Sequence, residues 1–133
     1  MFTADNRKKL IEHRKKLSKI ASVNWFSSNL GGLCAVSAYN LFKEFSELGY
    51  KPKILLLQNV WCSHALVIVD KLIIDLTATQ FGIKKKYLIE RRGKLKQIYP
   101  QFKTRKVFKD GNEFLYFIKD WKSSKQHPTQ YGL

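Results

Sequence analysis

The chain has 133 residues, the usual size of one domain and enough for a modest core without disulfide bonds. Hydrophobic residues make up 44% of it, which excludes a disordered chain, and no run approaches the roughly 20 apolar residues of a membrane span. Its 25 basic and 10 acidic residues give a formal net charge of +15. This charge favours acidic partners, either nucleic acid, an anionic membrane surface or an acidic protein, although a solvated basic surface explains it equally well.

The first predicted element is an amphipathic helix over residues 5–22. Asp5 or Thr3 is its expected N-cap, and His13 is expected on its surface. Docking on the domain is the favoured interpretation of this helix, ahead of a membrane-surface or calmodulin-binding helix. The N-terminus has no apolar signal-peptide core, so secretion would need a longer parent chain or a dedicated export system.

A second helix is predicted from Cys34 to a stop at Gly49, after an irregular approach that ends in Gly31 and Gly32. The start of a helix favours the thiolate form of a cysteine, which is the nucleophilic form. The same spacing places Cys34, Ala38, Leu41 and Phe45 on one stripe. A buried cysteine with a structural role is therefore the competing interpretation.

A short strand is predicted over 53–57, followed by a loop over 59–63 whose side chains are suited to lining a cleft. Residues 64–76 then predict an antiparallel hairpin with Asp70-Lys71 as a two-residue turn. In that register Leu66 lies opposite Asp75, and alternate residues of a strand share a face. His64 and Asp75 are therefore expected on the same face as diagonal neighbours, about 7–8 Å apart at the backbone.

The remainder of the chain gives weaker signals. Residues 77–82 form a polar exit that ends in glycine, and 84–92 are compatible with a strand or a short helix. A strand is expected over 103–108. Asp110 is a possible N-cap for a helix that carries Phe114, Leu115, Ile118 and Trp121. The tail from Ser123 is expected to fray.

Cys34, His64 and Asp75 thus form a possible catalytic triad, in which a base activates a thiol and a third group orients the base. Two cysteines are too few for a disulfide framework or a four-ligand zinc site, so no metal and no cofactor are expected. Cys62 and His64 are also poorly spaced for chelation on a strand. A disulfide between Cys34 and Cys62 would abolish the proposed activity.

Three motifs together resemble a known family. Leu33-Cys34-Ala35 opens a helix, His64-Ala65-Leu66-Val67 begins a strand, and a distinctive stretch runs from Ile74 to Phe81. This pattern, over residues 24–82, resembles the papain-fold toxin domains that form the C-terminal parts of bacterial polymorphic and contact-dependent growth inhibition toxins. It is also similar to glutamine-deamidase effectors and, more distantly, to the peptidase domains of bacteriocin exporters.

The resemblance implies a papain-like α+β fold, with a nucleophile helix on a small antiparallel sheet. Cys34 would be the nucleophile, His64 the base and then the acid, and Asp75 the orienting group. The glutamine that papain-like peptidases place before the cysteine is absent, and Asn29 is the substitute proposed for the oxyanion site, with the Cys34 backbone N–H. Trp61 and Gln80 are the other substrate-binding residues proposed.

The chain is therefore expected to be one catalytic toxin domain over 1–133, with an N-terminal helix over 1–23, a core over 24–122 and a flexible tail over 123–133. The expected activity is cysteine hydrolysis of protein amides, with glutamine deamidation slightly favoured over peptide cleavage because the peptidase glutamine is missing. The expected setting is secretion within a larger effector and action in the cytoplasm of a target cell. The expected partners are a protein substrate and an acidic cognate immunity protein, without stable membrane insertion.

Two alternatives remain open. A basic nucleic-acid-binding or ribonuclease toxin would use the positive charge to bind phosphates and would be indifferent to Cys34→Ala. A structural or adaptor domain would keep Cys34 in its core and show no thiol reactivity. For the hydrolase, alanine at each triad position is expected to abolish turnover and to leave thermal melting nearly unchanged.

Overall fold

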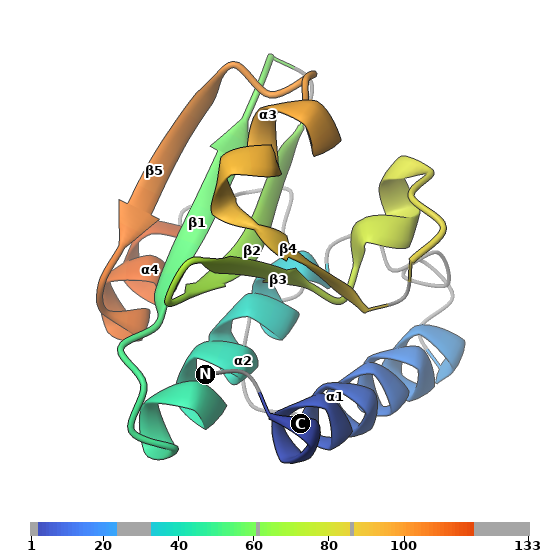
Figure 1. Cartoon of the computed structure of the whole chain (residues 1–133). Coiled ribbons are helices and arrows are strands. Elements are labelled where there is room, and N and C mark those ends of the chain that lie inside the picture. The colour runs from blue at the N-terminus through green and yellow to red at the C-terminus, as the bar shows by residue number, and fades with distance from the viewer. Residues whose placement is uncertain (1–2, 24–32, 61, 86, 119–133) are drawn as a thin grey trace.

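The computed structural model describes residues 3–23, 33–60, 62–85 and 87–118. These residues form an antiparallel five-stranded sheet in the order β4-β3-β2-β1-β5, together with four α-helices and two short 3-10 helices (Figure 1). The predicted α+β class is therefore confirmed.

The strands have four to seven residues each, and the longest helix is α1 with 20 residues. The strands are β1 (Lys53–Gln58), β2 (Ser63–Val69), β3 (Leu72–Asp75), β4 (Leu88–Arg91) and β5 (Thr104–Phe108). The α-helices are α1 (Ala4–Val23), α2 (Cys34–Glu47), α3 (Leu95–Ile98) and α4 (Gly111–Ile118), and the 3-10 helices are η2 (Ala78–Phe81) and η3 (Arg92–Lys94). Residues 84–92, which the sequence left open between strand and helix, thus contain β4.

The β2–β3 hairpin has the register that the sequence predicts. Val69 pairs with Leu72 and Val67 with Ile74, so Asp70 and Lys71 form the turn. Asp70 has a φ of 54°, the left-handed conformation that two-residue hairpin turns require and that aspartate tolerates better than most residues. This register fixes which side chains of the two strands share a face of the sheet.

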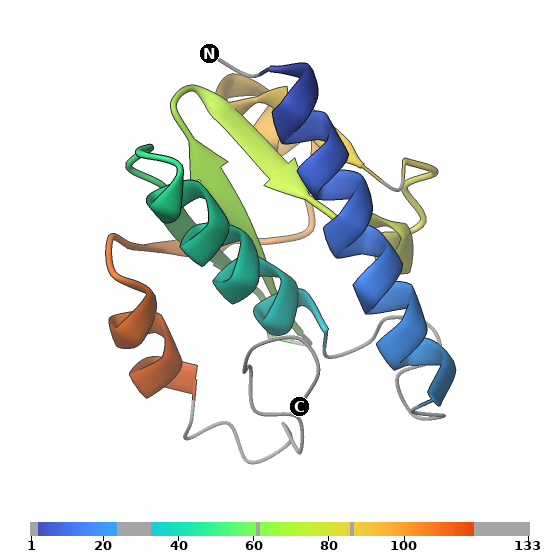
Figure 2. The same ribbon diagram turned by 90° about the horizontal axis from the view of Figure 1, so that it is seen from below.

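The two faces of the sheet are covered differently. Helices α1, α2 and α4 lie side by side along one face (Figure 2). There the inward side chains of the strands, among them Ile54, Leu56 and Val67, pack with Phe45 of α2 and Phe114 of α4. The opposite face is covered by the short helices η2 and α3, and its core includes Leu57, Leu66, Ile73 and Tyr99.

Helix α1 begins with the cap that its sequence predicts. The Asn6 backbone N–H donates to Thr3 Oγ1 at 3.2 Å, and Thr3 N–H donates to the Asn6 carbonyl oxygen Oδ1 at 3.0 Å. The predicted surface position of His13 is wrong: its ring is buried and Nε2 lies 3.1 Å from Glu44 Oε1 of α2. His13 lies between Leu10 and Leu17 on the stripe of α1 that packs against the domain, which is why it is buried.

Helix α4 also begins where the sequence predicts. Asp110 Oδ1 accepts a hydrogen bond from the Asn112 backbone N–H at 3.0 Å, as an N-cap does. Phe114 and Ile118 are buried, while Trp121 lies outside the described residues. No helix in the described part of the chain is both long enough and apolar enough to span a bilayer.

Candidate active site

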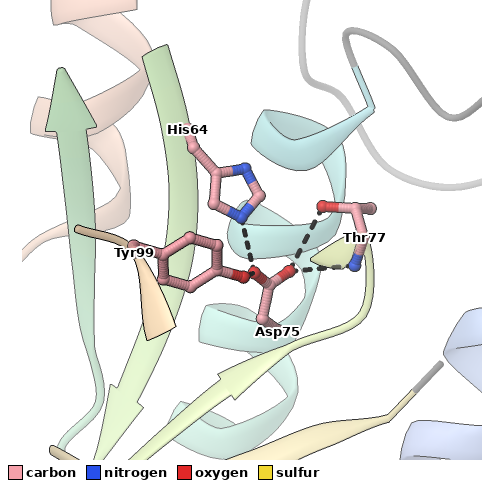
Figure 3. Close-up of polar contacts among 4 residues, drawn as sticks. All are labelled: His64, Asp75, Thr77 and Tyr99. Carbon is pink, nitrogen blue, oxygen red and sulfur yellow. Dashed lines mark hydrogen bonds and ion pairs between the residues drawn. The ribbon is translucent and has the colours of Figure 1, made fainter. Parts of the chain in front are cut away.

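The centre of the candidate site is a contact between the first part of β2 and the end of β3. His64 Nε2 lies 2.5 Å from Asp75 Oδ2, and both side chains are buried (Figure 3). An ionised carboxylate can only accept hydrogen bonds, so the Nε2 nitrogen carries the hydrogen. The geometric prediction that the hairpin brings these two residues to one face is confirmed.

Asp75 is held from both of its oxygens. The Thr77 backbone N–H donates to Oδ1 at 2.9 Å, and the Thr77 hydroxyl donates to the same oxygen at 3.2 Å. The Tyr99 hydroxyl donates to Oδ2, the oxygen that His64 also contacts. Four donors thus surround one buried carboxylate, and these donors supply the partners that a buried charge requires.

The electrostatics of the pair follow from this enclosure. Burial disfavours both charged forms, but the opposite charge and the hydrogen bond of His64, followed by the bonds from Tyr99 and Thr77, hold the pKa of Asp75 below its ordinary value. For His64, burial acts against the imidazolium, while the charge and hydrogen bond of Asp75 and a bond with Cys34 raise its pKa to about 10. Burial, and then the charge of Asp75, raise the pKa of Tyr99.

Cys34 is the first residue of α2, and its side chain interacts with His64. A side-chain hydrogen bond with Cys34 is one of the interactions that stabilise the imidazolium of His64. Because Nε2 is bound to Asp75, the other ring nitrogen is the one available to the thiol. In Figure 3 that nitrogen is turned away from Asp75, on the side where α2 begins. Cys34 itself is only 7% exposed.

Aromatic rings enclose the imidazole on the face of the sheet that α3 covers. The ring centroid of His64 lies 4.5 Å from that of Phe81, 5.3 Å from that of Tyr99 and 6.3 Å from that of Phe102. These rings exclude water from the His64–Asp75 contact, and a low local dielectric strengthens an interaction between opposite charges. The packing also restricts the imidazole to one orientation.

The other predicted site residues are placed less fully. Asn29 and Trp61 lie outside the described residues. Gln80 belongs to η2 by its backbone, and its side chain is likewise outside the described part. Their expected roles in oxyanion and substrate binding therefore remain predictions.

Sequence reasoning did not identify Tyr99 and Thr77 as parts of this site. Thr77 follows Asp75 by two residues, a spacing at which an aspartate side chain commonly accepts a bond from the backbone N–H. That pattern was available in the sequence. Tyr99 comes from 24 positions further along the chain, beyond the β4–α3 segment whose structure the sequence left open.

The described residues also bear on metal binding and disulfides. No group of three or more His, Cys, Asp or Glu side chains that could hold a metal ion occurs among them. Cys34 and Cys62 are both free thiols, the first buried and the second exposed. The Cys62 backbone N–H donates to Asn59 Oδ1 at 2.8 Å in the loop before β2.

Comparison with known proteins returned no relatives. No family model, no curated protein and no solved structure matches this chain.

Proposed function

We propose that this chain is a papain-like cysteine hydrolase that acts on amide bonds of proteins. One observation carries the proposal: Asp75 orients His64 through one ring nitrogen, and Cys34 at the start of α2 is near enough to contribute to the raised pKa of His64. A nucleophile, a base and an orienting carboxylate in that order form the constellation of nucleophilic amide hydrolysis. The motifs around Cys34, His64 and Asp75 support the same class.

The mechanism begins with the thiolate form of Cys34. Because the pKa of His64 is raised, the imidazolium holds its proton at neutral pH, and its positive charge favours a thiolate beside it. The thiolate sulfur attacks the amide carbonyl carbon, and the carbonyl π electrons move to oxygen. The first backbone N–H groups of a helix have no intrahelical partners, so those at the start of α2 are suited to hold this oxyanion.

The intermediate then collapses in two stages. The carbonyl re-forms, the carbon–nitrogen bond breaks, and His64 donates its proton to the departing ammonia or amine. Water next attacks the thioester while His64 takes one of its protons, and the thiolate of Cys34 is released. Deamidation and peptide cleavage differ only in the group attached to nitrogen, and we favour deamidation because the loop before Cys34 lacks the peptidase glutamine.

The biological setting that we propose is a bacterial toxin domain. It would be secreted as part of a larger effector, act in the cytoplasm of a target cell and be neutralised by an acidic immunity protein. The motif resemblance supports the first two parts of this proposal. The formal net charge of +15 supports an acidic inhibitor.

The decisive experiment measures thiol reactivity and turnover together. At pH 6, iodoacetamide is expected to alkylate Cys34 faster than Cys62, as read by peptide mass spectrometry. Access alone would favour Cys62, which is exposed, whereas Cys34 is 7% exposed, so a preference for Cys34 requires an activated thiolate. His64→Ala should remove the preference, and Cys62→Ser should leave the rate at Cys34 unchanged.

Turnover is scored in cells that express the chain. Mass spectrometry is expected to find glutamines heavier by about 1 Da, or new peptide termini, that are absent with Cys34→Ala and present with Cys62→Ser. Undiminished toxicity or turnover in Cys34→Ala would end the nucleophile assignment.

A further inference from the structure

A cluster of positive charge adjoins the candidate site. Residues 91–109 contain no Asp or Glu and hold eight basic residues, all of them exposed. We call them the basic segment cations: Arg91, Arg92, Lys94, Lys96, Lys103, Arg105, Lys106 and Lys109. Within the described part of the chain, no carboxylate forms an ion pair with any of them. The field of this segment is thus not neutralised by its own neighbours.

The same segment forms one wall of the site. Leu95 and Tyr99 of this segment are buried, and Tyr99 donates its hydroxyl hydrogen bond to Asp75. Phe102 packs against the imidazole of His64. The inner side of this layer therefore positions His64 and Asp75, while its outer side carries the cations.

Four of the cations lie on the side of the sheet that carries His64. Arg92 and Lys94 belong to η3, and Lys96 belongs to α3, which covers that face (Figure 1). Arg105 pairs with Leu57, which lies in the core on the same side. Because paired residues share a face, Arg105 projects to the side of α3 as well.

The aromatic residues of the segment are turned into the two cores. Tyr99 is buried and Phe102 is half-buried beside the imidazole of His64, and Phe108 is buried against Phe114 of α4. Proteins that hold single-stranded nucleic acid stack bases on exposed aromatic rings beside their cations. Lys106 lies over the Phe117 ring on the α4 side. The cations on the α3 side have no fully exposed ring of this segment beside them, so they fit carboxylates better than they fit bases.

We infer that Arg92, Lys94, Lys96 and Arg105 dock an acidic stretch of the protein substrate, so that the enzyme selects amides flanked by Asp and Glu. This inference rests on the proposed hydrolase activity and names the substrate class of that site. Attraction between such charges speeds encounter and is screened by salt, with a Debye length of about 8 Å at physiological ionic strength.

The first measurement is binding, made on the full chain with Cys34→Ala. Poly-L-glutamate is the probe, and fluorescence anisotropy gives its dissociation constant. Changing Arg92, Lys94, Lys96 and Arg105 together to Gln gives the α3-side variant. Binding by this variant should be about tenfold weaker, because exposed ion pairs are individually weak and act here as a set. Raising the salt concentration should weaken binding by the parent chain more than binding by this variant.

The matched control removes four exposed charges from α1. Lys8, Lys15, Lys16 and Lys19 are changed together to Gln, which lowers the net charge by the same amount. This variant should keep its affinity within about twofold, because its charges lie on α1, which packs on the side of the sheet opposite to α3, and exposed charges are screened by salt. Equal losses in the two variants would overturn the inference, since net charge alone would then explain binding.

A second probe tests the other class of macromolecule. Poly(U) of matched charge is expected to bind more weakly than poly-L-glutamate and to respond equally to the two sets of substitutions. Tighter binding of poly(U), lost specifically with the α3-side variant, would identify a nucleic-acid site and overturn the inference. Far-ultraviolet circular dichroism confirms that each variant is folded.

The third measurement uses the chain with Cys34 intact on a peptide mixture prepared from a whole proteome. Asp and Glu should be enriched around the modified or cleaved amides, and this enrichment should disappear in the α3-side variant but persist in the α1 variant. Products without acidic enrichment would refute the substrate class and leave the hydrolase standing. A complete absence of products would refute the hydrolase, and the binding arm would still report on the docking surface.

Discussion

The two faces of the sheet are built by opposite physical means. The face covered by α1, α2 and α4 is filled by aliphatic and aromatic side chains such as Phe45 and Phe114, neither of which is accessible to solvent. The other face encloses a charged pair, His64 and Asp75, within aromatic rings. Hydrophobic burial stabilises the core of the first face at any pH, whereas the contribution of the His64–Asp75 pair depends on the ionisation of both groups.

The two faces also differ in how strongly their stability depends on single contacts. Apolar packing tolerates small displacements, because no single contact in it is strong or directional. A buried ion pair is costly to desolvate and adds little net stability, but breaking it by removing one partner is strongly destabilising. A single substitution on the face that carries His64 and Asp75 should therefore alter both the stability of the fold and the reactivity of the thiol.

The largest loss of stability is expected on the helix-covered face, with Phe45→Ala. The ring is fully buried in the main core, so its removal should lower the free energy of unfolding by about 3–5 kcal/mol. Urea denaturation measures the loss. It should be the same at pH 6 and pH 8.5, because no ionisable group is removed, and Tyr116→Ala at an exposed position should change little.

Asp75→Asn is expected to lower the free energy of unfolding by as much as Phe45→Ala does, but only in the pH range where the ion pair is formed. It leaves His64 buried without its anion, so the free energy of unfolding should fall by about 3–5 kcal/mol near pH 6. This revises the expectation of unchanged melting at that position, because Asp75 is enclosed and not exposed. Preferential alkylation of Cys34 should be lost as well.

The sign of the pH dependence follows from the two shifted pKa values. The pKa of His64 is raised from 6.5 to about 10, so its stabilising contribution is complete below pH 6.5 and declines as the pH rises toward 10. The pKa of Asp75 is lowered from 3.8, so its contribution is present above that pH and is lost on acidification. The deficit of Asp75→Asn should therefore be greatest between about pH 4 and 6.5. A deficit that grows above pH 8 would contradict the ion pair.

The hairpin half of the site could be predicted from the sequence. A two-residue turn at Asp70-Lys71 sets the parity of both strands, and parity alone brings His64 and Asp75 to one face. The turn residues and the β-branched runs beside them are local signals. Cys34 at the start of a helix was predictable for the same reason, although its contact with His64 depends on how α2 packs against β2.

The remainder of the site depends on contacts that local signals do not encode. Tyr99 follows a one-turn helix after β4, and its approach to Asp75 depends on how that segment crosses the sheet. The position of His13 could have been inferred, since it lies three residues after Leu10 and four before Leu17. Its polar character favoured a surface position in the sequence, and the contact with Glu44 supplies the hydrogen-bond partner that its buried ring requires.

Tyr99→Phe is expected to give an intermediate effect. It keeps the ring that packs on His64 and removes only the hydroxyl that donates to Asp75, so the free energy of unfolding should fall by about 1.5–3 kcal/mol. The pKa of Asp75 should move back toward its ordinary value, so acid unfolding should begin at a higher pH than in the parent chain.

Circular dichroism during acid titration measures this shift. Tyr116→Phe, at a position 69% exposed, is the matched control and should leave the acid transition in place. Alkylation of Cys34 should slow in Tyr99→Phe but remain faster than in Asp75→Asn, because His64 keeps its carboxylate partner. An unchanged acid transition would show that Tyr99 serves packing alone.

The smallest effect is expected at the α1–α2 contact on the helix-covered face, with Glu44→Gln. Glu44 lies 3.1 Å from His13 Nε2 and 3.6 Å from Lys9 Nζ, and its side chain is 25% exposed, so the free energy of unfolding should fall by about 0.5–1 kcal/mol.

Burial lowers the pKa of His13, and Glu44 opposes that shift. A histidine whose pKa is lowered in the folded state binds a proton less readily there than in the unfolded chain. It therefore destabilises the folded state only below its ordinary pKa of 6.5, where the unfolded chain becomes protonated. The deficit of Glu44→Gln should therefore be larger below pH 6.5 than at pH 8, where only the contact of Glu44 with Lys9 is lost, whereas the deficit of Asp75→Asn stays large at pH 8. Urea denaturation at pH 5.5 and 8 thus distinguishes a peripheral ion pair from the enclosed one.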